Sequence, residues 1–222
     1  MHKLTAADFA DTGQWKLTVN ITKTGLEAVL ENTVHEDVEP QPLCRVEWGQ
    51  PEDHELLEKI ENTVYDNPRL LDDFSTKIVL FDPKTLFIPT EIAEESTGSE
   101  EEYHGRIYSC ERNDVMSAHD RDVTATWSFA PGVRSFLYRT FPGARITCNL
   151  LERVRESRKP GEGTCLNISR RDKEADLILT DGDLLLSAAT HECRNSEDLS
   201  RLIKNLLDAY GLNPENVKIK MN

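Results

Sequence analysis

Residues 15–30 read WKLTVNITKTGLEAVL, and this stretch decides how the rest of the chain is interpreted. Apolar side chains alternate with polar ones up to Ile21, and a second strand-like run contains Leu26, Val29 and Leu30, with Lys23-Thr24-Gly25 between the two runs. Alternation with a period of two is typical of a strand that has one buried face. A short polar break between two such runs indicates a hairpin, so the segment predicts two antiparallel strands.

The elements after this hairpin complete a first structural unit. Leu43 to Trp48 is a third strand-like run, and Pro51 then begins an amphipathic helix. The apolar side chains at helical spacing are Leu56, Leu57, Ile60 and Val64. Residues 77–81 form a continuous apolar run of the kind that is buried on both faces of a sheet. The first unit is therefore predicted to have the order βββαβ.

The middle of the chain is less regular. Residues 86–122 are predicted to be an irregular insert, in which the acidic stretch from Glu91 to Glu102 forms a solvated helix or a loop. A strand at 123–129, a helix at 131–141 and a strand at 144–150 follow. Residues 152–163 are rich in charge, Gly and Pro, which favours a loop.

The opening pattern then returns. Three strand-like runs cover residues 164–169, 175–180 and 184–189, and Asp181-Gly182 between the last two suits a tight hairpin. Asn195 or Ser196 caps a strongly amphipathic helix, and a strand at 217–221 ends the second βββαβ unit. The sequence predicts an α/β protein made by duplication, with a first half at residues 1–143 and a second at 144–222.

Composition excludes several classes of function. The 222 residues have a formal net charge of −14, which disfavours nucleic acid and anionic lipid as partners. The five cysteines, Cys44, Cys110, Cys148, Cys165 and Cys193, are scattered without a C-x-x-C pair, as in reduced cytosolic proteins. No window resembles a membrane span or an apolar leader. We expect a cytoplasmic protein without membrane insertion.

A short motif occurs in both halves. Asn20-Ile21-Thr22 stands at the end of the first strand of one unit, and Asn167-Ile168-Ser169 stands at the end of the first strand of the other. Both match the N-x-S/T glycosylation pattern, but that interpretation requires secretion, which the sequence does not favour. At equivalent places in two equivalent units, the motif supports the duplication.

With these elements in place, the chain resembles the actin, sugar kinase and Hsp70 superfamily. More closely, it resembles a family of bacterial proteins of unknown function described as having an actin-like ATPase fold, which is ribonuclease H-like. The residues that carry the resemblance are residues 17–29, Phe81 to Pro89 with Leu86-Phe87-Ile88-Pro89, Phe136 to Pro142, and Asn195 to Leu199. The resemblance covers nearly the whole chain and implies mixed sheets in two related halves.

The resemblance also implies where a nucleotide would bind. Members of the superfamily hold ATP with an Asp-x-Gly turn after the first strand of each half, because the carboxylate carries the water shell of the metal and the glycine lets phosphate approach. Asn20 and Asn167 replace the aspartates here, and Thr22 and Ser169 replace the glycines. We expect degenerate phosphate turns at these four positions, with no catalytic residue, no metal site, and ATP and Mg²⁺ not favoured as cofactors.

The second half also lacks a glycine pair of the adenosine-binding type after its final strand. The resemblance therefore implies that this half is shortened or that part of the nucleotide cleft is missing.

Other candidate sites have simpler interpretations. His191-Glu192-Cys193 and His119 to Asp122 lack a second ligand pair at zinc-site spacing. Cys165 or Cys148 beside His191 would form a nucleophile, yet cysteine in an apolar strand is more often a buried hydrophobe. The Asp181 and Asp183 pair favours turn geometry over acid–base catalysis. One basic cluster would bind a phosphate or an acidic partner, or be a solvated loop; its members are Arg153, Arg155, Arg158, Lys159, Arg170, Arg171 and Lys173.

Three functions remain open. The favoured one is a non-enzymatic, pseudo-ATPase module that binds an unidentified protein partner. The alternative is a divergent nucleotide-binding ATPase or kinase, and a weaker one is a cytoplasmic platform of a pilus or secretion assembly, by analogy of fold alone. The sequence leaves the oligomeric state open.

Overall fold

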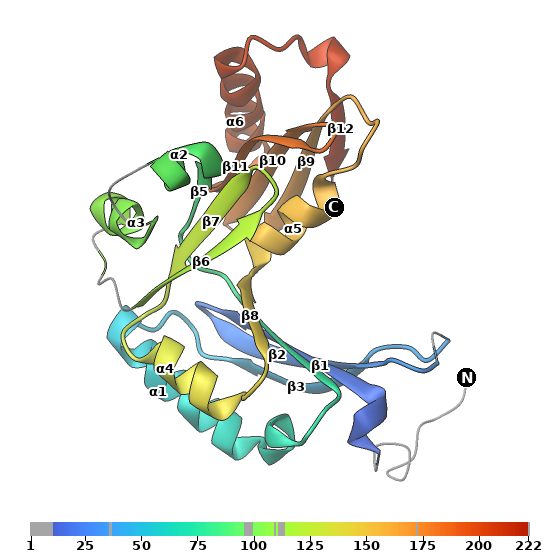
Figure 1. The fold of residues 1–222 in the computed structure, drawn as a ribbon, viewed down its shortest axis with the longest axis vertical. Helices are drawn as coiled ribbons and strands as arrows, with labels where there is room; N and C mark the ends of the chain where they lie inside the picture. The colour runs from blue at the N-terminus through green and yellow to red at the C-terminus, as the bar shows by residue number, and fades with distance from the viewer. Residues whose placement is uncertain are drawn as a thin grey trace. The chain divides into compact units, whose positions relative to one another are not determined.

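The computed structural model describes residues 11–35, 37–95, 100–108, 110, 114–171 and 173–221. The chain forms two compact units (Figure 1). The first comprises Met1–Pro83 with Phe129–Cys148, and the second comprises Lys84–Ser128 with Asn149–Asn222. Each unit is therefore assembled from two separate stretches of sequence.

The first unit is built on a five-stranded mixed sheet with the order β3-β2-β1-β4-β8. Its strands are β1 (Trp15–Thr22), β2 (Gly25–Asn32), β3 (Gln41–Glu47), β4 (Thr76–Phe81) and β8 (Arg145–Cys148). The first three are antiparallel neighbours, whereas β4 runs parallel to β1 and β8 runs parallel to β4. In β1, every second side chain is buried, which confirms the predicted alternation.

Two helices of the first unit lie side by side beneath this sheet, α1 (Asp53–Asp66) and α4 (Val133–Thr140) (Figure 1). A capping box between Glu52 and Glu55 satisfies backbone donors at the start of α1. Its apolar stripe, Leu56, Ile60 and Val64, is buried as the sequence predicts. Short 3-10 helices at Thr12–Gln14 and Pro68–Leu71 begin β1 and lead toward β4.

The second unit contains a four-stranded sheet with the order β11-β10-β9-β12. Its strands are β9 (Thr164–Arg171), β10 (Glu174–Asp181), β11 (Leu184–Glu192) and β12 (Lys218–Met221). The order and directions repeat those of β3-β2-β1-β4, because β9, β10 and β11 are antiparallel and β12 runs parallel to β9. The duplicated βββαβ unit is therefore present, and this sheet corresponds to the first four strands of the first.

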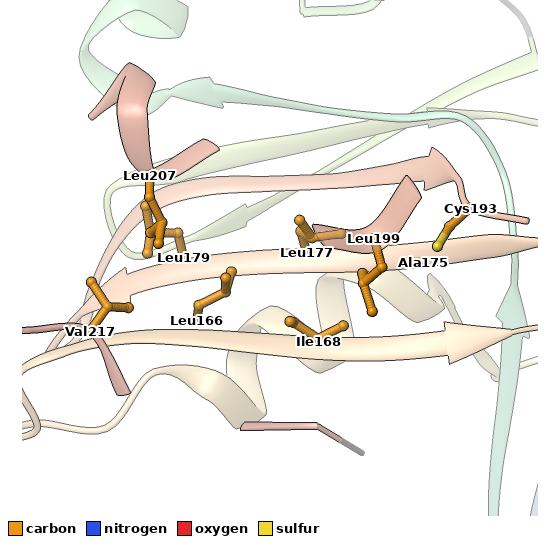
Figure 2. Packing of buried hydrophobic residues seen from close by; sticks show 9 residues of the cluster. All are labelled: Leu166, Ile168, Ala175, Leu177, Leu179, Cys193, Leu199, Leu207 and Val217. Atoms are coloured by element: carbon orange, nitrogen blue, oxygen red, sulfur yellow. The ribbon is translucent and has the colours of Figure 1, made fainter. Parts of the chain in front are cut away.

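Helix α6 (Ser196–Ala209) covers one face of the four-stranded sheet. Figure 2 shows Leu199 and Leu207 of this helix directed at the apolar side chains of the strands. Asn195 caps α6 by accepting a hydrogen bond from the backbone N–H of Asp198 at 2.8 Å, as the sequence predicts. A 3-10 helix at Pro214–Asn216 then leads into β12.

The predicted irregular insert is more ordered than expected. It forms a three-stranded antiparallel sheet, β5-β7-β6, from β5 (Thr85–Pro89), β6 (Val115–Asp120) and β7 (Val123–Ser128). The acidic stretch contains two helices, α2 (Thr90–Glu95) and α3 (Glu100–Tyr108), and α3 packs against β6 and β7. Residues 96–99 of that stretch lie outside the described residues.

The loop predicted for residues 152–163 is wrong over its first half. Helix α5 (Asn149–Ser157) follows β8 at once and packs on β10 and β11, on the face opposite to α6. Leu150, Leu151 and Val154 are buried at helical spacing. The strand predicted for residues 144–150 correspondingly ends at Cys148.

The structure also divides the chain differently from the predicted halves. Residues 84–128, predicted to belong to the first half, join the second unit because Val123 and Phe87 pack with Leu150, Ile178 and Leu185. Strand β8 stays with the first unit, since it pairs with β4. The predicted boundary at residue 143 therefore falls inside the first unit.

Candidate functional site

The hairpin between β1 and β2 is the first candidate phosphate turn. Asn20 and Thr22 lie in the last part of β1, opposite Glu27 and Gly25 of β2. The Thr22 hydroxyl donates to the carbonyl oxygen of Gly25 at 3.3 Å and accepts from the backbone N–H of Thr24 at 3.3 Å. The carbonyl of Thr24 accepts from the backbone N–H of Trp48 at 2.8 Å. This turn is thus closed by hydrogen bonds within the chain.

Gly25 has a packing role in the same hairpin. A Cβ atom at this position would lie 2.5 Å from the carbonyl oxygen of Val46 on the neighbouring strand β3. Non-bonded atoms do not approach so closely, so a side chain here would push β3 away. The glycine of this turn therefore lets two strands meet.

The second pair of predicted positions lies inside a strand. Asn167 and Ser169 belong to β9 and pair with Ile178 and Asp176 of β10. Strand β9 continues to Arg171, so Asn167 stands two residues further from its strand end than Asn20 does. The two Asn-Ile-Thr/Ser motifs are therefore not equivalent in register, and Asn167-Ile168-Ser169 is not a turn. That any of these four positions is a degenerate cofactor site stays a prediction.

Asn167 and Ser169 nevertheless line a cavity within the second unit. This cavity, which we call the α5 pocket, has a volume of about 390 Å³ and lies between α5 and the sheet. It is lined by Arg153, Glu156, Ser157, Lys159, Asn167, Ile168, Ser169, Ile178 and Lys220. The lining combines three cationic side chains with hydroxyl and amide groups, a set that favours anionic ligands.

A buried carboxylate pairs with Arg153, which lines the α5 pocket. Asp176 of β10 has no exposed side-chain surface, and it accepts hydrogen bonds from Arg153, from Arg171 at 3.0 Å and from the Thr190 hydroxyl at 2.6 Å. Burial of a charge is tolerated when it is paired and hydrogen-bonded in this way. Two guanidinium groups share this carboxylate, and Arg171 also lies 3.9 Å from the carboxylate of Glu174, so two cations and two anions balance in this cluster.

A second carboxylate, that of Glu162, also pairs with two cations, one of which lines the α5 pocket. Glu162 lies 2.8 Å from the ammonium of Lys220 and 3.8 Å from that of Lys218. The hydrogen bond from Lys220 holds the pKa of Glu162 below its usual value, and the same bond raises the pKa of Lys220. Both groups are therefore charged at neutral pH, and the two ammonium groups around Glu162 exceed its charge by one.

The predicted basic cluster divides into two groups. Arg155 and Arg158 extend from α5 to the β6–β7 turn, where Arg158 is fully buried and pairs with Asp120 at 3.1 Å and with Asp122 at 2.8 Å. Arg153 and Lys159 face the α5 pocket, and Arg170 in β9 is exposed. The expectation of a solvated loop is wrong for Arg158, which links two parts of the second unit.

The remaining sequence candidates have structural partners. His119 contacts the Thr124 hydroxyl through Nδ1 at 2.8 Å, Asp181 accepts from the Thr164 hydroxyl at 3.2 Å, and Asp183 lies 3.7 Å from Arg121. Cys148, Cys165 and Cys193 are buried. Within the described ranges, no group of three or more His, Cys, Asp or Glu side chains is arranged to hold a metal ion.

Two important residues escape prediction from sequence. Asp176 and Lys220 become significant only when β9, β10 and β12 are placed side by side. An acidic residue within the apolar run of β10 is the available signal for Asp176, because a strand interior seldom buries an unpaired charge. Lys220 has no comparable local signal.

The arrangement of sheets and helices is that of an actin-like ATPase fold. A crystal structure from Bacteroides thetaiotaomicron, described as a protein with actin-like ATPase fold and unknown function, matches with a TM-score of 0.75 and 17% identity, covering 97% of this chain and 84% of that one. Residues 5–222 match the family described as "Protein of unknown function (DUF3822)". The chain belongs to this family.

Other solved structures match more weakly. The Ppx/GppA phosphatase of Aquifex aeolicus has a TM-score of 0.42 and 9% identity, covering 88% of this chain and 62% of that enzyme. No curated protein is significantly similar to the chain in sequence. Among the described residues, no helix has both the length and the apolar character needed to cross a membrane.

Proposed function

We propose that this chain is a non-enzymatic, cytoplasmic protein that keeps the actin-like fold as a platform for a protein partner and does not hydrolyse ATP. The observation that carries the proposal is the closed β1–β2 hairpin. The Thr22 hydroxyl holds this turn through two hydrogen bonds, and the carbonyl oxygen of Val46 fills the space beside Gly25. A phosphate-binding turn needs free backbone N–H groups and space beside them.

The side chains at the hairpin support the same conclusion. Asn20 supplies a neutral amide, which is a weaker ligand for the water shell of Mg²⁺ than a carboxylate. Lys23 at the turn pairs with Asp53 of α1 at 3.2 Å. Among the described residues, the turn itself offers a metal–phosphate complex neither a carboxylate at position 20 nor an open glycine.

Exposed aromatic side chains support a role in protein binding. Tyr65 of α1 is 59% exposed and Tyr138 of α4 is 49% exposed, and both belong to the first unit. Tyrosine is enriched in protein interfaces because it offers a large contact area with a polar tip. These two residues are our candidates for a partner contact.

Hydrolysis of Mg-ATP by the purified chain is the first test. We expect phosphate release no faster than in a protein-free control, for the wild type and for the isosteric variant Asn20→Asp. The variant is a matched probe, since a site that used Asn20 weakly would gain Mg²⁺ affinity from a carboxylate. Saturable hydrolysis that Asn20→Asp accelerates would overturn the proposal and favour the divergent ATPase instead.

The partner contact has a separate test. Cross-linking in the native cell should join the chain to one protein in near-stoichiometric amount, and Tyr65→Glu with Tyr138→Glu should abolish that product. The control variant Lys204→Glu changes an exposed residue of α6 in the second unit and should leave the product intact. A product that survives the tyrosine changes would contradict the assignment of this surface.

A further inference from the structure

We propose that the α5 pocket binds a small organic phosphate. The inference goes beyond the proposed function, because the pocket lies wholly in the second unit and requires neither hydrolysis nor the β1–β2 hairpin. Its basis is a set of unused hydrogen-bond donors, an excess of positive charge and a volume larger than a bare phosphate needs. These features come from three parts of the unit: α5 with the residues after it, the β9–β10 pair, and β12.

The donors come from side chains whose hydrogen bonds are incomplete. Asn167 is 8% exposed, and among the described residues its amide makes one hydrogen bond, a weak one to the Cys165 sulfur at 3.6 Å. Within the described part of the chain, no hydrogen bond occupies the hydroxyls of Ser157 and Ser169, which line the same cavity. A largely buried amide costs free energy unless it is hydrogen-bonded, so a ligand that bonds to it is favoured.

The charged side chains around the α5 pocket favour an anionic ligand. Five cations lie at or directly behind the lining, namely Arg153, Lys159, Arg171, Lys218 and Lys220, against the four carboxylates of Glu156, Glu162, Glu174 and Asp176. The excess is one positive charge in a chain whose net charge is −14. A phosphate monoester carries close to two negative charges at neutral pH, so an excess of positive charge favours its binding.

Two features oppose an anion and limit where it can sit. Glu156 lies on the lining, and the carbonyl end of α5 contributes partial negative charge near Ser157. The ammonium groups of Lys159 and Lys220 lie on the same lining and offset both. We therefore place the phosphate between Lys159, Lys220 and the Asn167 amide.

The size of the cavity indicates that the ligand is more than inorganic phosphate. A volume of about 390 Å³ falls within the range of ordinary small-molecule sites. Ile178 forms an apolar part of the wall beside the polar groups. A phosphate group attached to a small organic body, such as a sugar phosphate, fills this space and leaves a neutral portion against Ile178.

The test uses isothermal titration calorimetry of the full chain with glucose 6-phosphate as probe. We expect saturable binding of glucose 6-phosphate, weaker binding of inorganic phosphate, and no binding of glucose. Lys159→Gln and Lys220→Gln should each weaken glucose 6-phosphate binding by about tenfold, as expected for the loss of one charge-assisted hydrogen bond. Lys204→Gln on α6 is the matched control and should leave the affinity unchanged.

Each other outcome contradicts the proposal. Equal affinity for the dicarboxylate malonate would show that the pocket is a general carboxylate site. The absence of heat with every probe would show that the pocket binds none of these compounds. Binding that resists both lysine changes would lie elsewhere on the chain. Circular dichroism of the variants establishes that they are folded, and Asn167→Ser, which keeps a small polar side chain, should weaken binding even if one lysine variant misfolds.

Discussion

At the level of single residues, Gly25 lets strand β3 approach closely where the two strands pair. Replacing Gly25 with Ala puts a Cβ atom 2.5 Å from the Val46 carbonyl oxygen, so β3 must move. We expect Gly25→Ala to lower the free energy of unfolding by about 1–3 kcal/mol, as for other overpacked sites. Urea denaturation measures this loss. Gly163→Ala is the control, because a Cβ atom there meets nothing within 4 Å, and an equal loss in both variants would contradict the explanation.

A second residue-level prediction concerns His104 in α3. Its ring is fully buried, Nδ1 lies 3.0 Å from the Thr126 hydroxyl, and Nε2 has no hydrogen-bond partner among the described residues. Burial lowers the pKa of His104, although its bond to Thr126 acts in the opposite direction. Above the unfolded pKa of about 6.5, both states are neutral and stability is complete. Below it, the unfolded chain takes up a proton that the buried ring resists, so stability falls with pH.

The measurement is the free energy of unfolding at pH 7.5 and at pH 5.5. His104→Asn should flatten the difference between the two values, whereas the exposed His54→Asn should preserve it. A pH dependence that His104→Asn leaves unchanged would assign the effect to other groups.

At the level of elements, α5 depends on a buried arginine. Arg158 follows the helix and joins it to the β6–β7 turn through Asp120 and Asp122. Arg158→Met removes both ion pairs of the buried guanidinium, and although Asp120 keeps Arg155 at 3.1 Å, the change should cost about 3 kcal/mol of stability, the lower end for a broken buried pair. The exposed pair of Arg201 with Asp198 is the comparison, and Arg201→Met should cost less than about 1 kcal/mol. Thermal unfolding of both variants measures the two losses of stability, and losses of similar size would contradict this role of Arg158.

The same element shows why part of the fold could not be predicted from sequence. The strands and helices with strong periodicity, such as β1 and α6, were predicted correctly because one face of each is apolar. Helix α5 is short, and its arginines and the following Gly and Pro residues resemble a solvated loop. What orders it is tertiary: Arg158 bonds to a turn more than thirty residues earlier in the sequence. A local pattern cannot report such a contact.

The candidate site was predictable only in fragments. The motif at Asn167 and the basic cluster were both visible, yet nothing in the sequence places Lys220 opposite Asn167, because that requires the parallel pairing of β12 with β9. The apparent repeat of Asn-Ile-Thr/Ser suggested equivalent turns. It failed because Arg170 and Arg171 continue the strand by pairing with Ala175 and Glu174.

At the level of the whole molecule, the chain combines the sheets of an actin-like ATPase fold with a hairpin whose turn is held by hydrogen bonds of the Thr22 hydroxyl. The chain shares its fold with the Bacteroides thetaiotaomicron protein, and a likeness of fold does not by itself imply a reaction. In our account, the first unit keeps its hairpin for stability, and ligand recognition belongs to other surfaces.

The amide resonance of Thr24 in a ¹⁵N NMR spectrum tests this account most directly. Its backbone N–H donates to the Thr22 hydroxyl, and it would be among the first groups to contact a phosphate held by the hairpin. We predict that millimolar Mg-ATP leaves this resonance unchanged, even if the α5 pocket takes up phosphate elsewhere. A saturable shift of the Thr24 amide that requires Mg²⁺ would contradict the account.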